Sequence, residues 1–203
     1  KNTELIYIDR LINEVASDSN YFNLIKNNLA NNEIRTRRIS KIWKKNIKDS
    51  YDSLVYINDF TKAGDIGPWF NEPITWVQLI QTGDLKLIRD KDLLDALFNY
   101  YNSIKKNSDN FNQYPMKMIN KARENWVKAF KNVDFEEYGG MEDISKTPAK
   151  SVYAYIWKNK DFYLELYDKI GIISHRNKVT MGELENLSKM MLEKLKSYKQ
   201  VIE

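Results

Sequence analysis

The chain has 203 residues, 42% of them hydrophobic and 30% charged, and its 32 basic and 28 acidic side chains leave a net charge of +4. Only seven glycines and four prolines interrupt it, whereas a β-fold needs turn residues about every 8–12 positions, so the composition predicts long helices. The absence of cysteine excludes disulfides, a thiolate nucleophile and cysteine-ligated zinc. The sequence contains no run of about 18 apolar residues that would span a bilayer.

The first third of the sequence predicts a long helix. Neither glycine nor proline occurs between Lys1 and Ala63, and the apolar residues recur at steps of three and four, as on one face of a helix. The asparagine-rich stretch 27–33 has weak helix propensity and is a candidate for a bend. We expect one long helix of about 55 residues, bent or straight, rather than two short ones. Its apolar stripe consists of Leu5, Ile8, Ile12, Val15, Phe22, Leu29, Ile39, Trp43, Ile47, Tyr51 and Leu54.

A break rich in glycine and proline follows at residues 61–73. Pro73 suits the first turn of a short helix that runs through Thr82, because its missing N–H has no partner there. Gly83 is placed to end that helix, since a helix C-cap favours a residue that tolerates positive φ. After a short apolar connector, Asp90 is the predicted N-cap of the next helix.

The rest of the chain predicts further helices. One runs from Asp90 toward Pro115, which restarts the helix because proline cannot continue it. An acidic loop with two glycines covers 134–148, a short aromatic helix covers 151–157, and a last long helix runs from about Asp161 to the end. We therefore expect a single all-α domain over residues 1–203, an elongated antiparallel helical bundle with long first and last helices and shorter middle helices.

Residues that carry catalytic or metal chemistry form no diagnostic motif. His175 is the only histidine, so a two-histidine zinc site is excluded, and its neighbour Ser174 would point about 100° away on a helix. Neither a nucleophile elbow nor a phosphate-binding glycine loop is present. The acidic loop has no ligand spacing typical of a calcium site. We expect neither a catalytic residue, nor a metal site, nor a cofactor.

Aromatic residues gather in two parts of the sequence, around the first break and before the last helix. Aromatic pockets bind small molecules in many proteins, so one hypothesis is a sensor of a small ligand. The competing interpretation is that these rings fill the core, as helically spaced aromatic residues more often do. The candidate ligand-binding residues are Trp69, Trp76, Tyr153 and Trp157.

A basic run over residues 35–48 holds seven basic side chains and no acidic one. If it is helical, four of them align opposite an apolar stripe, which is typical of helices that bind nucleic acid or anionic lipid headgroups. The competing interpretation is a solvent-facing side whose cations pair with acids elsewhere in the fold. The candidate polyanion-binding residues are Arg37, Lys41, Lys44 and Lys48.

Two stretches carry a resemblance to a known family. WVQLIQTGDLKLIRDKDLLDALFNYY, residues 76–101, and ELIYIDRLINEVASDSNYF, residues 4–22, resemble uncharacterised bacterial membrane proteins with one N-terminal transmembrane helix and an extracytoplasmic helical domain. The resemblance implies a membrane anchor upstream of Lys1 and a periplasmic location, where nucleic acid is not an expected partner. The basic run over 35–48 departs from the family pattern. No catalytic residue is carried over.

These observations lead to three hypotheses of function. The first is a non-enzymatic extracytoplasmic domain of a membrane-tethered protein with a role in interaction or sensing. Its expected partner is an unknown protein or a small ligand, and a homo-oligomer is possible. The second is the small-molecule sensor with an aromatic pocket, and the third is polyanion binding through the basic run.

Overall fold

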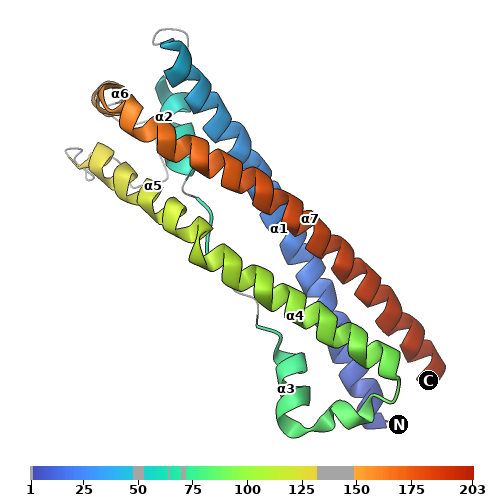
Figure 1. Ribbon diagram of the computed structural model, residues 1–203. Helices are drawn as coiled ribbons and strands as arrows, with labels where there is room; N and C mark the ends of the chain where they lie inside the picture. Colours follow the sequence, from blue (N-terminus) through green and yellow to red (C-terminus); the bar gives the residue numbers. More distant parts are fainter. Residues whose placement is uncertain (1, 48–52, 64, 70–71, 132–148) are drawn as a thin grey trace. The chain divides into compact units, whose positions relative to one another are not determined.

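The structure is a computed structural model that describes residues 2–47, 53–63, 65–69, 72–131 and 149–203. Within these ranges the chain is helical with no strand, and its first and last helices are the longest, which confirms the predicted fold class (Figure 1). None of the described helices combines the length and apolar character that crossing a membrane requires. The elements are α1 (Asn2–Lys45), α2 (Ser53–Lys62), α3 (Ile74–Thr82), the 3-10 helix η1 (Asp84–Leu87), α4 (Lys91–Gln113), α5 (Pro115–Phe130), α6 (Ala149–Lys158) and α7 (Lys160–Ile202).

The first helix is long but shorter than predicted. It passes through the asparagine-rich stretch 27–33 without a break, because buried residues on either side pack against α7 and outweigh the weak local propensity. The prediction of about 55 helical residues is wrong, since the helix ends at Lys45 and a separate helix begins at Ser53. Ile47 lies beyond the end of α1, and Tyr51 lies outside the described residues.

Hydrogen bonds of the backbone explain why α1 ends at Lys45. Asn46 has a left-handed φ of 53°, and its N–H donates to the carbonyl of Trp43 at 3.2 Å. The N–H of Ile47 donates to the carbonyl of Ile42, also at 3.2 Å. This pair of bonds is a Schellman motif, in which asparagine takes the place of the more common glycine.

Three other predicted helix ends are confirmed, whereas Pro73 precedes α3 as its N-cap residue and does not lie in its first turn. Gly83 follows α3 with a φ of 72°, and the Asp90 carboxylate accepts the N–H of Leu93 at 2.9 Å at the start of α4. Pro115 is the first residue of α5. These ends are set by local chemistry, which is why the sequence predicts them.

The described chain forms two compact units, and α1 and α7 contribute to both. Unit 1 contains the residues up to Asn27 together with Trp69–Phe111 and Asn177–Glu203, and unit 2 contains Asn28–Pro68 and Asn112–Arg176. Each unit therefore has its own part of the two long helices and its own set of shorter ones.

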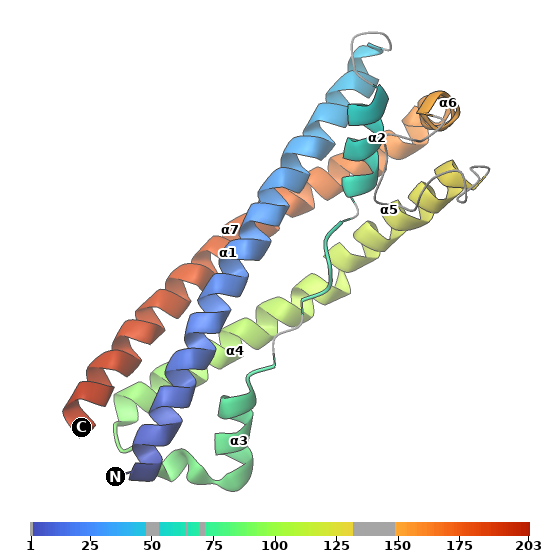
Figure 2. The same cartoon turned by 180° about the vertical axis from the view of Figure 1, so that it is seen from behind.

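In unit 1, α1 and α7 run antiparallel. Near the start of α1, Glu4 accepts a hydrogen bond from the hydroxyl of Tyr198 at 2.6 Å, and further along it Lys26 forms an ion pair with Glu185. Helices α3 and α4 complete the unit (Figure 2). Its fully buried residues include Ile8, Leu11, Val15, Phe22, Leu79, Leu93, Leu97 and Leu195.

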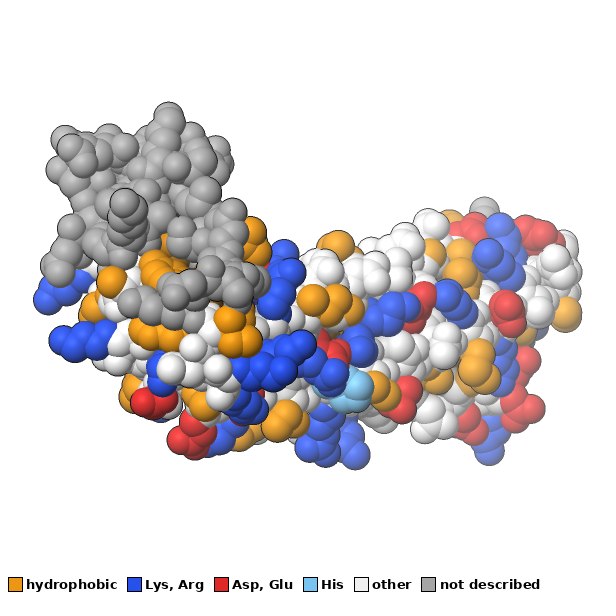
Figure 3. Space-filling view, turned by 90° about the horizontal axis from the view of Figure 1, so that it is seen from above, with side chains coloured by type: hydrophobic (Ala, Val, Ile, Leu, Met, Phe, Trp, Pro, Cys, Tyr) orange, Lys and Arg blue, Asp and Glu red, His pale blue; other side chains and the backbone are white. Residues whose placement is uncertain are grey.

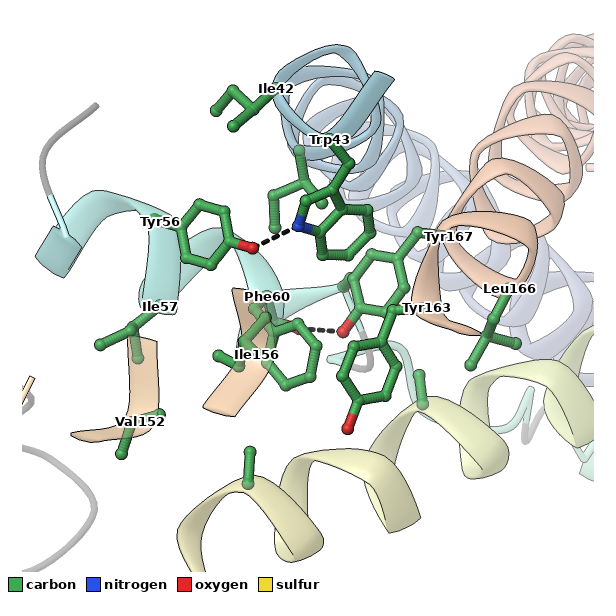
Figure 4. Packing of buried hydrophobic residues seen from close by; sticks show 14 of the residues in the cluster. Ile42, Trp43, Tyr56, Ile57, Phe60, Val152, Ile156, Tyr163, Leu166 and Tyr167 are labelled. Atoms are coloured by element: carbon green, nitrogen blue, oxygen red, sulfur yellow. Dashed lines mark hydrogen bonds between the residues drawn. The ribbon is translucent and has the colours of Figure 1, made fainter. Parts of the chain in front are cut away.

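Unit 2 is built around an aromatic core (Figure 4). The indole N–H of Trp43 donates to the hydroxyl of Tyr56. Tyr167 stacks on Phe60 with ring centroids 5.2 Å apart and donates its hydroxyl to the Phe60 carbonyl at 2.6 Å. These bonds satisfy the polar ends of buried rings, which an apolar core otherwise leaves without partners.

At Gly171, α7 lies close to α1 in unit 2. A Cβ atom at this position would lie 2.9 Å from the hydroxyl oxygen of Thr36. That hydroxyl is held in place because it donates to the carbonyl of Asn32 at 2.8 Å. The glycine thus has a packing role that offsets its low helix propensity.

We predict opposite effects of alanine at the two glycines of α7. Gly182→Ala should raise the free energy of unfolding by about 0.5–1 kcal/mol, because alanine favours the helix and the nearest atom, Cδ of Lys26, is 3.8 Å away. Gly171→Ala should lower it by about 1–2 kcal/mol, because the added methyl group overpacks the contact with Thr36. Urea unfolding curves of both variants measure the difference, and stabilisation by both would contradict the close approach.

Candidate functional site

Helix α3 carries no charged side chain. Its nine residues, ITWVQLIQT, are five apolar side chains and four uncharged polar ones. Its start and end are marked by Pro73 and Gly83, but no side chain of its own caps its N-terminus.

The missing cap is supplied by Glu14 of α1. Its carboxylate accepts the backbone N–H of Thr75 at 2.6 Å and that of Trp76 at 3.4 Å. The first N–H groups of a helix lack partners within the helix and carry a partial positive charge, so a carboxylate satisfies both requirements. The same carboxylate accepts the hydroxyl of Tyr101 on α4 at 2.6 Å. Glu14 therefore ties α3 to α1 and α4 at once.

Two more side chains of α1 hold the α3–η1 segment. Arg10 donates to the side-chain oxygen of Gln78 at 2.6 Å, and Tyr7 donates its hydroxyl to Asp84 at 2.7 Å. The Tyr7 hydrogen bond lowers the pKa of the Asp84 carboxyl. Together with Glu14, these residues occupy positions i, i+3 and i+7 of α1, which places them on one side of that helix.

The inner side of α3 packs on α4 through Trp76. Its ring stacks on Tyr101 with centroids 4.8 Å apart and meets Phe98 edge to face at 4.9 Å. Thr75 and Leu79 are buried on the same helix. Burial, with the nearby charge of Glu14, raises the pKa of Tyr101 far above its ordinary value, so this phenol remains a hydrogen-bond donor.

The outer side of α3 carries an apolar row that faces solvent. Ile74 is 67% exposed, Val77 41% and Ile80 46%. At i, i+3 and i+6 they lie within an arc of about 120° on the helix. We refer to these three residues as the outer row. Apolar side chains on one side of a short uncharged helix, held from the other side by polar bonds, make this the candidate site.

The four aromatic residues predicted to bind a ligand are divided between the units. In unit 1, Trp69 meets Phe22 edge to face with centroids 5.4 Å apart, and Trp76 packs on α4. In unit 2, Tyr153 and Trp157 stack with centroids 6.1 Å apart. Each of the four rings contacts another aromatic ring of its own unit.

The basic run lies in α1 of unit 2 as far as Lys45, and two of its four candidate residues form ion pairs. Arg37 pairs with Glu33 at 2.5 Å, and Lys44 pairs with Asp168 of α7 at 2.6 Å. Lys41 is exposed, and Lys48 lies outside the described residues. Figure 3 shows basic side chains interspersed with acidic and hydrophobic ones on the face that it views.

The single histidine also takes part in this pairing. Nδ1 of His175 lies 3.0 Å from the Glu33 carboxylate, and its neighbour Ser174 accepts a hydrogen bond from the side-chain amide of Asn32, also at 3.0 Å. The two neighbours thus have different partners, as their separation on the helix predicts. Within the described residues there is no group of three or more histidine, aspartate or glutamate residues that would hold a metal. The acidic loop 134–148 lies outside them.

Comparison with known protein families, with characterised proteins and with solved structures finds no match. The resemblance to membrane-anchored bacterial proteins therefore stays a prediction.

The outer row was not predicted from the sequence. Its signal was present in the stretch 74–82, which has apolar residues in more directions than one buried face accommodates. The i, i+3, i+7 spacing of Tyr7, Arg10 and Glu14 was a second signal. Neither indicates by itself which face of α3 turns inward.

We predict that Glu14→Gln loosens α3 without unfolding unit 1. The amide keeps an oxygen acceptor but loses the charge, and hydrogen bonds to charged groups exceed neutral ones by about 1–2 kcal/mol. Hydrogen exchange of the backbone N–H groups of α3 should quicken accordingly, while that of α4 should change little. Glu183→Gln, at an exposed glutamate of α7, is the matched control. Equal exchange in both variants would contradict the capping role.

We predict that stability falls in alkaline solution because buried phenols resist ionisation. Burial is the first cause that raises the pKa of Tyr100, Tyr101, Tyr56 and Tyr167. Below about pH 10 these groups are protonated in both states, so they add no pH dependence. Above it the unfolded chain releases protons that the folded chain keeps, and each such tyrosine lowers the free energy of unfolding by up to about 1.4 kcal/mol per pH unit.

Urea unfolding at pH 8 and pH 11, with absorbance at 295 nm to count tyrosinate, measures this effect. The pH dependence should be shallower in Tyr101→Phe, which lacks one of the buried phenols. Titration of all 13 tyrosines near pH 10 in the folded protein would show the prediction to be wrong.

Proposed function

We propose that this chain is a non-enzymatic helical domain of a membrane-tethered protein, that it lies outside the cytoplasm, and that it binds a partner through the outer row of α3. The observation that carries the proposal is the exposure of the outer row. Polar bonds from α1 and the stacking of Trp76 hold α3 in place, whereas Ile74, Val77 and Ile80 face solvent. A partner that covers these side chains removes apolar surface from water, which is favourable by about 25 cal/mol per Å².

The exposed positions of α3 differ from those of the neighbouring helix α4. On the neighbouring helix α4, exposed positions are mostly charged or amide side chains, among them Asp95, Asn102, Lys105 and Asp109. The same rule applied to α3 would place polar residues at its exposed positions, at no cost to the packing of Trp76. Three neighbouring apolar residues on one exposed face form a small apolar patch, and the apolar patches of monomeric proteins are often functional.

The engagement of ionisable side chains supports a non-enzymatic role. The buried Asp18 carboxylate accepts the hydroxyl of Tyr100 at 2.7 Å, and the Glu14 carboxylate caps α3. His175 lies against Glu33. In each case the group that would carry acid–base chemistry holds one helix to another.

The tether is what the resemblance implies, and the arrangement of unit 1 decides which elements such a tether would bring close to the membrane. Figures 1 and 2 both place the start of α1 at the same end of unit 1 as α3 and η1, and Tyr7 joins these elements through Asp84. A membrane segment leading into α1 would therefore hold α3 close to the membrane.

The cysteine-free sequence allows one labelling experiment to test both location and binding. Ile74→Cys reports on the outer row, and Ile172→Cys of α7 is its control because the two positions are equally exposed, at 67% and 68%. A membrane-impermeant maleimide is added to intact cells that express the protein with its tether. We expect rapid labelling at position 172 and slow labelling at position 74, with equal rates in the purified protein.

Two outcomes would contradict the proposal. Equal labelling of both variants in cells would mean that nothing covers the outer row. Labelling of both only after cell lysis would place the domain on the cytoplasmic side.

A further inference from the structure

The outer row of α3 is symmetric about its middle residue. Ile74 and Ile80 are the same residue type and lie three positions on either side of Val77. A two-fold axis that passes beside Val77 therefore brings Ile74 of one chain against Ile80 of another, and Val77 against its own copy. The row would thus meet the same row of a second copy, as the symmetric interface of a two-fold dimer requires.

The absence of charged side chains on α3 suits contact with a second copy. Like charges that meet across a two-fold axis repel each other, and most helices of a chain with 30% charged residues carry such charges. Helix α3 carries none. Its exposed polar side chains, Gln81 and Thr82, each have donor and acceptor groups, so two copies near each other are compatible.

The row is also rigidly presented. Glu14 caps the start of α3, Arg10 holds Gln78 and Trp76 anchors the inner side. A surface whose backbone is already ordered loses little conformational entropy on association. The fastening of α3 from within therefore favours binding at its outer side.

From these observations we propose that the occupant of the outer row is a second copy of this chain, paired across a two-fold axis at Val77. The inference rests on the proposed function, because it names the partner of the same surface. Three partly exposed side chains supply much less than the ~800 Å² per partner of a stable interface, so the dimer is weak in solution. Tethering to a membrane raises the effective concentration of the two copies and favours their pairing.

Disulfide cross-linking tests the two-fold axis directly. A cysteine on the axis meets its own copy, and two Cα atoms must lie within about 7 Å for a bridge to form. Val77→Cys should form a disulfide-linked dimer under mild oxidation, roughly tenfold or more faster than a control cysteine, since pairing raises its local concentration. The control is Val55→Cys on α2, which has nearly the same exposure, 40% against 41%.

Mixed chains test the register. Ile74→Cys alone and Ile80→Cys alone should cross-link slowly, because neither position faces itself across the axis. A mixture of the two variants should form the mixed dimer rapidly. Faster cross-linking of Ile74→Cys alone than of Val77→Cys would overturn the proposed axis.

Sedimentation of the cysteine-free chain gives a measurement that does not depend on cysteine variants. The unmodified chain should show concentration-dependent dimerisation, which Val77→Glu abolishes by placing two carboxylates on the axis, and which Val55→Glu leaves intact. A monomer at every concentration, with equal cross-linking at positions 77 and 55, would overturn the dimer. If position 74 is nevertheless protected in cells, a different molecule covers the row, and the proposed function stands without the dimer. If position 74 is unprotected, the proposed function itself fails.

Discussion

One carboxylate, that of Glu14, connects three helices of unit 1. It satisfies backbone N–H groups at the start of α3 and accepts the phenol of Tyr101 on α4, while its own backbone belongs to α1. A short helix such as α3 is marginal by itself, because nine residues are too few to offset the cost of nucleation. Its position, and therefore the direction in which its apolar residues face, depends on this contact and on the stacking of Trp76.

The same chemistry recurs along α1 in unit 1. Glu4 accepts the hydroxyl of Tyr198 and Asp18 that of Tyr100, so α1 meets α7 and α4 through acid–phenol bonds. A phenol has a large apolar ring and a single hydroxyl donor. The ring packs in the core, and the hydroxyl donates its hydrogen bond to the carboxylate. Unit 2 is organised differently, around aromatic rings that donate mainly to each other and to the backbone.

Helix ends that depend on neighbouring residues could be predicted from the sequence, and those that depend on packing could not. Gly83 and Asp90 act through their own backbone or side chain, and both were predicted. Asn46 ends α1 although asparagine is a weaker C-cap than glycine. The stretch 27–33 stays helical although its propensity is weak, and Asn32 and Glu33 within it bond to Ser174 and His175 of α7. From the sequence alone, Gly171 lowers the helix propensity of the last helix. In the structure, its lack of a Cβ atom permits the close contact with Thr36.

The candidate site shows the same limit more clearly. Periodicity predicts that a helix has an apolar face, but residues 74–82 are apolar in several directions, so periodicity cannot select the inner one. The choice is made by partners distant in sequence, since Glu14 and Arg10 each bind more than 60 positions away. Glu14 and Arg10 fix the orientation of α3 so that Trp76 points inward. Ile74, Val77 and Ile80 then lie on the outer side of the helix. The exposure of the outer row is thus a property of the tertiary structure, whereas the equal spacing of Ile74 and Ile80 about Val77 is a property of the sequence.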